Sequence, residues 1–118
     1  MKEEEKDLLL RDLCARLLYG VKVQIVSSTL NTLYCKKYDD VLSNNNLFRV
    51  FKDDTIVRPY LRPMSSMTEE ETKQFYSLPF CDWNCYERID WLNEHHFDYR
   101  GLIEKGLALE APKDMYEL

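Results

Sequence analysis

Two cysteines and two histidines in the C-terminal half are the residues best suited to bind a metal ion. They are Cys81, Cys85, His95 and His96, in the pattern C-x3-C-x9-H-H. A structural zinc site needs four such ligands that converge as a tetrahedron. This spacing matches no standard zinc finger, and adjacent side chains on one helix point about 100° apart. We therefore expect no metal and no other cofactor, with His96 packed on an apolar helix face and His95 solvated at the helix end.

Covalent and acid–base catalysis are also poorly supported. A cysteine nucleophile needs a base beside its thiol, and no recognised motif surrounds Cys81 or Cys85. An acid pair such as Glu94 and Asp98 could form a hydrolase dyad, but acids at helical spacing are usually solvated. The chain has only 3 Gly, which does not favour a glycine-rich phosphate loop. We predict a protein without catalytic activity.

Aromatic and arginine residues are the candidates for binding a partner protein, because Tyr, Trp and Arg contribute most of the binding energy where they are desolvated. They are Tyr60, Arg62, Trp91, His95, Tyr99 and Arg100. The same side chains could instead lock helices onto a sheet. The sequence leaves both roles open.

Basic residues interleaved with aromatic residues in the middle of the chain support a second hypothesis. They could hold single-stranded nucleic acid by phosphate contact and stacking. The bases are Lys36, Lys37, Arg49, Lys52 and Arg58. Neighbouring acids such as Asp39 and Asp53 oppose this use, and the alternative is that these are ordinary polar positions on the open face of a sheet.

The elements that must position these residues begin with a helix over residues 3–18. Acids in its first turn favour the helix dipole, and Gly20 is the natural left-handed stop. Apolar residues recur at the spacing of one buried stripe, in which Cys14 is a small buried group. The stripe consists of Leu10, Leu13, Cys14, Leu17 and Leu18, and Leu9 widens it.

Short strands should follow, because apolar residues then alternate with polar ones. A run of Ser and Asn at residues 43–46 is typical of a loop. We predict strands over residues 21–25, 29–38, 47–51 and 56–57.

A proline-rich crossover should separate this β region from a helical C-terminal half. Pro59 and Pro63 keep the residues before them out of the helical region, so the crossover is extended and stiff. Thr68 and Glu71 form a capping box, which predicts a helix over residues 68–78. Further helical segments are expected over residues 85–97 and 99–105, and a short strand over 107–109.

Composition indicates one globular domain. The 118 residues are 45% hydrophobic and 31% charged, with a net charge of −5, and a chain of this size can bury a sizeable core. No secretory segment and no apolar run of about 20 residues is present, so we expect a cytoplasmic protein with reduced cysteines. Residues 11–62 carry nine bases and five acids, whereas residues 63–118 carry five bases and twelve acids, which excludes a general nucleic-acid coat.

We predict an α+β fold in a single domain over residues 1–118. Residues 1–20 form the N-terminal helix, and residues 21–63 form a small antiparallel sheet of three to five strands, or a partly open SH3-like barrel. Residues 64–112 form a layer of two or three helices, and residues 113–118 form a tail. The prediction makes the crossover a hinge between the sheet and this layer.

Three blocks of the sequence resemble a family of short proteins from gut-bacterial genomes, prophages and phages. The blocks are DLCARL at residues 12–17, RPYLRPMSSMTEEE at 58–71, and DWLNEHHFDYRGLIEKGLALEAP at 90–112. Cys81 and Cys85 lie outside them. The resemblance implies a phage or mobile-element setting and carries no activity with it. Our hypothesis is a non-catalytic accessory protein that binds a partner protein, such as a host-defence effector of the CRISPR type; the alternative is a small nucleic-acid-binding module.

Overall fold

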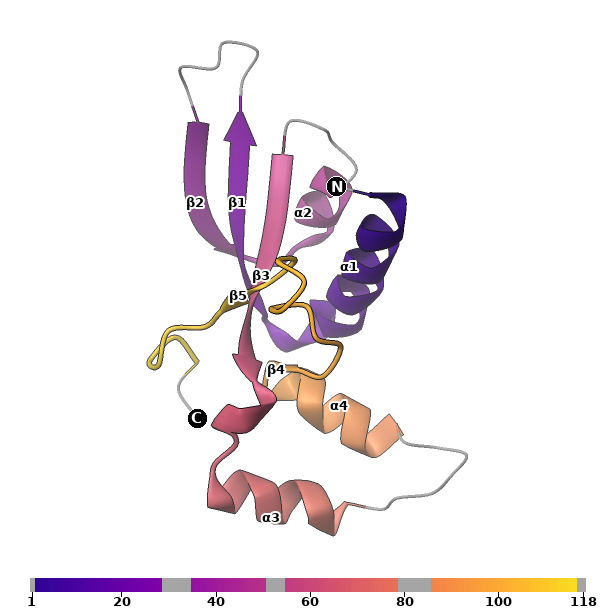
Figure 1. Ribbon diagram of the computed structural model, residues 1–118, viewed down its shortest axis with the longest axis vertical. Coiled ribbons are helices and arrows are strands. Elements are labelled where there is room, and N and C mark those ends of the chain that lie inside the picture. Colours follow the sequence, from indigo (N-terminus) through magenta and orange to yellow (C-terminus); the bar gives the residue numbers. More distant parts are fainter. Residues whose placement is uncertain (1, 29–34, 51–54, 79–85, 117–118) are drawn as a thin grey trace.

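The computed structural model describes residues 2–28, 35–50, 55–78 and 86–116 (Figure 1). The α+β class is confirmed. A sheet occupies one end of an elongated molecule, with α1 and α2 beside it and α3 and α4 toward the opposite end. The helices are α1 (Glu3–Arg16), α2 (Asn44–Arg49), α3 (Glu69–Ser77) and α4 (Tyr86–Glu94), with short 3-10 turns at Leu17–Tyr19 and Met64–Ser66.

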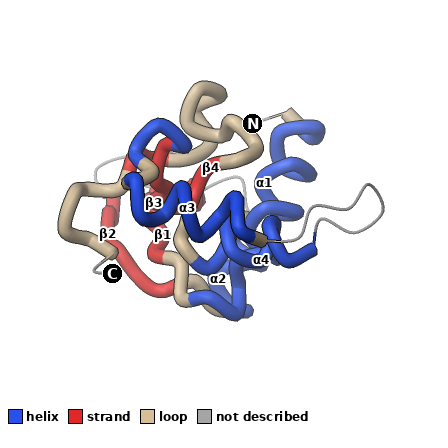
Figure 2. The backbone as a smooth tube through the Cα atoms, turned by 90° about the horizontal axis from the view of Figure 1, so that it is seen from below, coloured by secondary structure: helices blue, strands red, loops and turns tan. Residues whose placement is uncertain are grey.

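The sheet is mixed rather than wholly antiparallel. Its strands are β1 (Lys22–Ser28), β2 (Cys35–Val41), β3 (Thr55–Pro63), β4 (Phe97–Asp98) and β5 (Leu109–Glu110). Their order is β2-β1-β3-β4, and β5 also pairs with β3. The β2-β1-β3 part is antiparallel, whereas β4 and β5 run parallel to β3. Seen along the long axis, α1 lies to one side of the strands (Figure 2).

The proline-rich segment is extended, as predicted, but it is the central strand β3 rather than a hinge beyond the sheet. Pro59 has no N–H to donate and lies opposite Val23 of β1. Just past this pair a side chain bridges the two strands: the backbone N–H of Lys22 donates to the Tyr116 hydroxyl over 2.8 Å, and that hydroxyl donates to the Tyr60 carbonyl over 2.7 Å. Beyond that point β3 pairs with β4 and β5, so one strand joins every part of the sheet apart from β2.

The predicted loop at residues 43–46 and the predicted strand at 47–51 are wrong over the residues described. Helix α2 lies there instead. Ser43 is its N-cap and accepts a hydrogen bond from the Asn46 backbone N–H, the role for which serine is preferred. Leu47 and Val50 then fall three residues apart, which is helical spacing for an apolar face.

The C-terminal half differs from its prediction mainly in where helices end. The Thr68–Glu71 capping box of α3 is confirmed. Helix α4 stops at Glu94, and His96 has a positive φ of 63°, so the chain turns into β4. Residues 99–105 form turns rather than a helix, because the Asp98 carboxylate accepts the backbone N–H groups of Leu102 and Ile103 over 2.9 and 3.0 Å.

Helix α1 buries only part of the predicted apolar stripe: Leu13 is buried and Leu17 packs against the core. Its fully buried residues are Leu9, Asp12, Leu13 and Arg16. Cys14 and Leu18, which were predicted to be buried, are exposed. Because Asp12 and Arg16 point inward, the helix is rotated so that part of its apolar surface faces outward.

The inward ion pair has three close contacts. The Nε and Nη2 atoms of Arg16 donate to the two Asp12 carboxylate oxygens over 2.8 and 3.1 Å, and Nη2 also donates to the Phe97 carbonyl over 2.6 Å. Both side chains are 0% exposed. The pair therefore joins α1 to β4 through the centre of the molecule.

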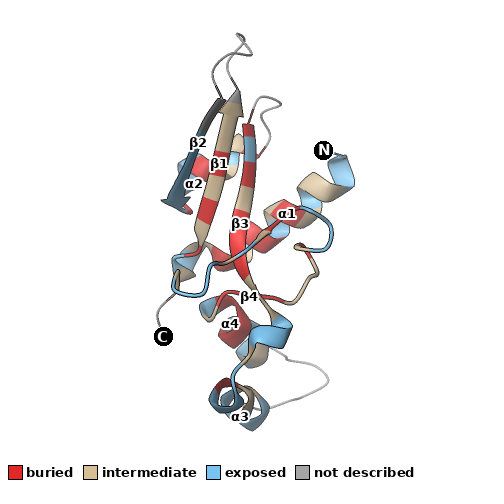
Figure 3. Cartoon of the chain, turned by 60° about the vertical axis from the view of Figure 1, so that its left-hand side comes forward, coloured by how far each residue is buried: buried red, intermediate tan, exposed pale blue. Residues whose placement is uncertain are grey.

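Two apolar clusters surround this pair. The larger lies between α1 and the sheet and includes Leu9, Leu13, Ile25 and Leu61, and the smaller consists of Trp91, Leu92 and Phe97. Figure 3 shows the buried positions in red along β1, β3 and α1. Phe97 belongs to the smaller cluster, so its contact with Arg16 connects the two.

Replacing Arg16 by Met should lower the free energy of unfolding by about 3 kcal/mol, because Asp12 would keep a buried charge with only Arg100 beside it. The double variant Asp12→Leu/Arg16→Met should lose less than the single variant, since the buried carboxylate is removed together with its partner and Arg100, whose side chain is 29% exposed, can still contact solvent. Urea unfolding followed by circular dichroism measures both, with Arg11→Met on the exposed side of α1 as the control. A loss at position 16 no larger than that at position 11 would show that the pair does not hold α1 in place.

Candidate functional site

Arg62, a predicted partner-binding residue, is held by two neighbours. Its Nη1 and Nη2 atoms donate to the two Glu71 carboxylate oxygens, each over 2.8 Å. Its guanidinium group lies 4.2 Å from the centre of the Phe97 ring. The hydrogen bonds from Arg62 lower the pKa of Glu71 to about 2. Arg62 therefore fastens α3 to the end of β3.

Trp91 and His95 form a ring stack that also contacts Phe97. Their ring centres are 4.1 Å apart, and Trp91 also stacks on Phe97 at 5.7 Å. The His95 Nδ1 atom lies 2.9 Å from the Trp91 carbonyl oxygen. Trp91 is buried and His95 is half-buried. The expectation of a solvated His95 therefore holds only in part.

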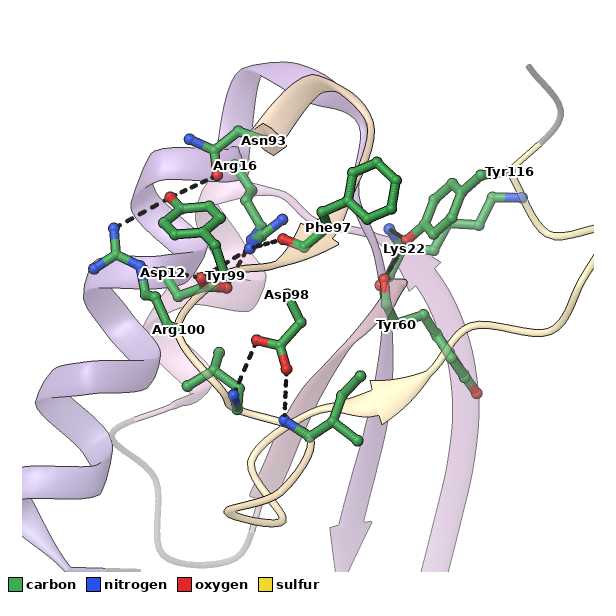
Figure 4. Close-up of polar contacts among 12 residues, drawn as sticks. Asp12, Arg16, Lys22, Tyr60, Asn93, Phe97, Asp98, Tyr99, Arg100 and Tyr116 are labelled. Carbon is green, nitrogen blue, oxygen red and sulfur yellow. Dashed lines mark hydrogen bonds and ion pairs between the residues drawn. The ribbon is translucent and has the colours of Figure 1, made fainter. Parts of the chain in front are cut away.

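Tyr99 and Arg100 extend the Asp12–Arg16 pair toward α4 (Figure 4). The Tyr99 hydroxyl donates to the Asn93 side-chain oxygen over 2.8 Å. Arg100 places its Nε atom 3.3 Å from an Asp12 carboxylate oxygen and donates from Nη2 to the Tyr99 hydroxyl. These contacts bring α1, α4 and the segment after β4 together.

Tyr60 lies on β3, two residues before Arg62, but its hydroxyl contacts the neighbouring strands rather than the helices. Its hydroxyl donates to the Asp39 carboxylate over 2.7 Å and accepts from Gln24 over 3.1 Å. Burial and the Asp39 contact raise the pKa of Tyr60. All six predicted binding residues thus have contacts within the chain. Those of Tyr60 lie within the sheet, and those of the other five support the alternative that they lock helices onto the sheet. Their binding role stays a prediction.

The metal-like cluster is not assembled among the described residues. Cys81 and Cys85 lie outside them. The His96 ring is buried as predicted, but it is not on a helix face, because α4 ends at Glu94. It stacks on Tyr116 with ring centres 3.8 Å apart, and its burial lowers the pKa of His96 to about 4. Within the four described ranges, no three His, Cys, Asp or Glu residues are grouped to hold a metal ion.

The predicted nucleic-acid residues are divided between two faces of the sheet. Arg58 lies in register with Gln24 and Asp39, and Lys37 lies in register with Val26, so Lys37 and Arg58 share the face of Asp39. Arg49 is on α2 and donates to the hydroxyl of Tyr38, whose register with the buried Ile25 places it on the opposite face. Lys52 and the side chain of Lys36 lie outside the described residues. The register therefore mixes an acid into the small basic face.

The feature most suited to binding is an apolar surface on α1 and α2. We call it the α1–α2 surface and define it as Leu10, Cys14, Leu18, Leu47 and Phe48. Leu18 is 90% exposed and Phe48 is 69% exposed. Between the two helices lies a groove of about 380 Å³ lined by Leu10, Cys14, Asn44, Leu47 and Phe48. Cys14 and Leu18 are one helical turn apart, so the apolar surface continues past the groove.

The sequence pattern places Leu10, Cys14 and Leu18 in the predicted buried stripe rather than at the surface. A usable signal was the width of the pattern, because apolar residues at positions 8, 9, 10, 13, 14, 17 and 18 cover more than the single stripe that one core contact needs. Phe48 was assigned to a strand, so its exposure at the end of a short helix was missed.

A larger hollow of about 690 Å³ lies near the end of β3. It includes Arg62, which already pairs with Glu71, and both acids and bases line it. The lining residues are Arg62, Pro63, Ser66, Thr68, Glu110, Ala111, Pro112, Lys113, Asp114 and Tyr116. This mixture defines no particular ligand.

Comparison with known proteins found no matching family model, no similar curated protein and no similar solved structure. The four helices described are each too short or too polar to cross a membrane.

The Arg62–Glu71 pair makes a pH-dependent contribution to stability. The pKa of Glu71 is lowered from 4.5 to about 2 on folding, so its stabilisation is complete above pH 4.5 and is lost as the pH falls toward 2. A shift of this size corresponds to about 3 kcal/mol. Glu71→Gln should lower the free energy of unfolding at pH 7, and its difference from the natural protein should shrink toward pH 2.

Chemical unfolding at several pH values measures this difference, with the exposed Glu70→Gln as the control. Glutamine preserves the capping box, so the comparison isolates the ion pair. A difference that stays constant from pH 7 to pH 2 would contradict the lowered pKa.

Proposed function

We propose that this protein is a non-catalytic accessory protein that binds a partner protein through the α1–α2 surface. The observation that carries this proposal is the apolar groove lined by the exposed Phe48, with the exposed Leu18 four residues beyond its lining residue Cys14. Large apolar side chains that gather at a surface rather than standing singly are typical of interaction sites. Groups with the chemistry for catalysis, such as Asp12 and Glu71, are instead paired with arginines.

The phage or mobile-element setting is part of the same proposal. It rests on the resemblance of three sequence blocks. Those blocks include Asp12, Arg16, Arg62 and Trp91, whose contacts join the helices to the sheet. The α2 residues of the binding surface lie outside these blocks, in a segment that we expect to vary with the partner. A host-defence effector of the CRISPR type is the class of partner we propose for such an element.

The nucleic-acid alternative has less support. Its described residues do not converge on one face, and Asp39 lies in the same row across the sheet as Arg58, with Gln24 of β1 between them. A net charge of −5 also opposes general binding to a phosphate backbone.

Phe48→Glu should abolish recovery of the partner from a lysate of the native host, because a charge in an apolar contact must be desolvated on binding. Tyr76→Glu is the matched control, since Tyr76 lies on α3 and is 68% exposed. Tagged proteins would be compared by pull-down and mass spectrometry. Substitutions of Arg62 or Tyr99 are unsuitable here because they also break contacts within the fold. If Phe48→Glu and Tyr76→Glu recovered equal amounts of the partner, whether reduced or unchanged, the α1–α2 surface would not be the binding site.

A further inference from the structure

Acidic residues continue the line of the α1–α2 surface toward the N-terminus of α1. Glu3 and Asp7 precede Leu10 and Cys14 at positions i, i+4, i+7 and i+11, which lie on one side of a helix. Glu3 and Asp7 are both exposed. Within α1, every residue of which the structure describes, the exposed charged residues are Glu3, Glu4, Asp7 and Arg11. Three acids against one base give this exposed side a net charge of −2.

The groove itself carries no charge, because its lining residues are apolar or neutral. The surface therefore has an uncharged groove with Glu3 and Asp7 toward one end, and Arg11 is the one exposed base of α1 beside it. Helix α1 extends over roughly 20 Å, or about four turns, and Leu18 lies in the 3-10 turn that follows it. The acidic end of the surface and its apolar centre are about two turns apart.

A second copy of this chain is a poor occupant of such a surface. Antiparallel pairing of two α1 helices would place the acids of one copy against Leu18 of the other and desolvate them without a partner. Parallel pairing would place acids against acids, and each chain already carries a net charge of −5. The charges instead require a partner that is basic at one end and apolar along the rest.

We infer that the occupant is an amphipathic helix of the partner protein, with lysines or arginines at its C-terminal end, lying antiparallel to α1. A groove between two helices suits a helix that inserts apolar side chains at i, i+3, i+4 and i+7. Basic residues are favoured at a helix C-terminus by its own dipole, and the antiparallel arrangement places them beside Glu3 and Asp7. This inference rests on the proposed function, since it names the partner of the same surface.

Three fluorescein-labelled peptides of about four helical turns test the inference by fluorescence anisotropy. They share one leucine stripe and carry lysines at the C-terminal end, lysines at the N-terminal end, or glutamates at the C-terminal end. The C-terminal lysine peptide should bind tightest, and Glu3→Lys/Asp7→Lys should weaken it by about tenfold, which corresponds to two modest charge contacts. Glu69→Lys/Glu70→Lys on α3 is the matched control and should leave the affinity unchanged.

The outcomes separate this inference from the proposed function. Equal binding of the three peptides, all lost in Leu18→Glu, would overturn the inference and leave an apolar binding surface. Tighter binding of the N-terminal lysine peptide would overturn the antiparallel orientation. Absence of binding by every peptide, or binding that Leu18→Glu leaves intact, would overturn the inference and count against the surface itself. Equal weakening by the α1 and α3 charge reversals would reduce the effect to the net charge of the protein.

Discussion

The buried ion pair between Asp12 and Arg16 is the interaction on which the rest of this structure depends. Two charges removed from water are costly unless they are paired and hydrogen-bonded, so they determine which face of α1 points inward. Arg16 also donates to the Phe97 carbonyl, which joins the helix to β4 and to the smaller apolar cluster. The orientation that satisfies this pair leaves Leu18 and Cys14 outside. A polar constraint in the core thus accounts for an apolar surface outside it.

Arg62 and Arg100 have the same role as Arg16: each joins two elements of the fold by pairing with an acid. Arg62 holds Glu71 while stacking on Phe97, and Arg100 approaches Asp12 while donating to Tyr99. Each arginine therefore contacts both an acid and an aromatic ring, which covers the arginine while its charge is paired. These arginine contacts join α3 to β3 and α1 to the segment after β4. Asp12, Glu71 and the arginines that pair with them are thus engaged in holding the fold, and the surface that we propose for recognition is largely apolar.

Local signals in the sequence predicted the elements that depend on local chemistry. The Thr68–Glu71 capping box and the Gly20 stop are both present, because each needs only a few adjacent residues. The sequence could not show that β3 pairs with β4 and β5, since those contacts join residues far apart in the chain. The candidate site was missed for a related reason: whether Leu18 or Leu9 is buried depends on the distant Phe97 carbonyl that binds Arg16. Ser43 was the available signal for α2, and it was assigned to a loop.

The rotation of α1 is measured most directly at Cys14. Labelling of the folded protein with iodoacetamide, followed by mass spectrometry of the peptide that contains Cys14, reports on this thiol separately from Cys35, Cys81 and Cys85. If the ion pair faces inward, Cys14 should react at a rate within about tenfold of the unfolded chain, because no opening of the structure is needed. Protection of Cys14 by about a hundredfold or more would place it in the core and contradict both the orientation of α1 and the binding surface derived from it.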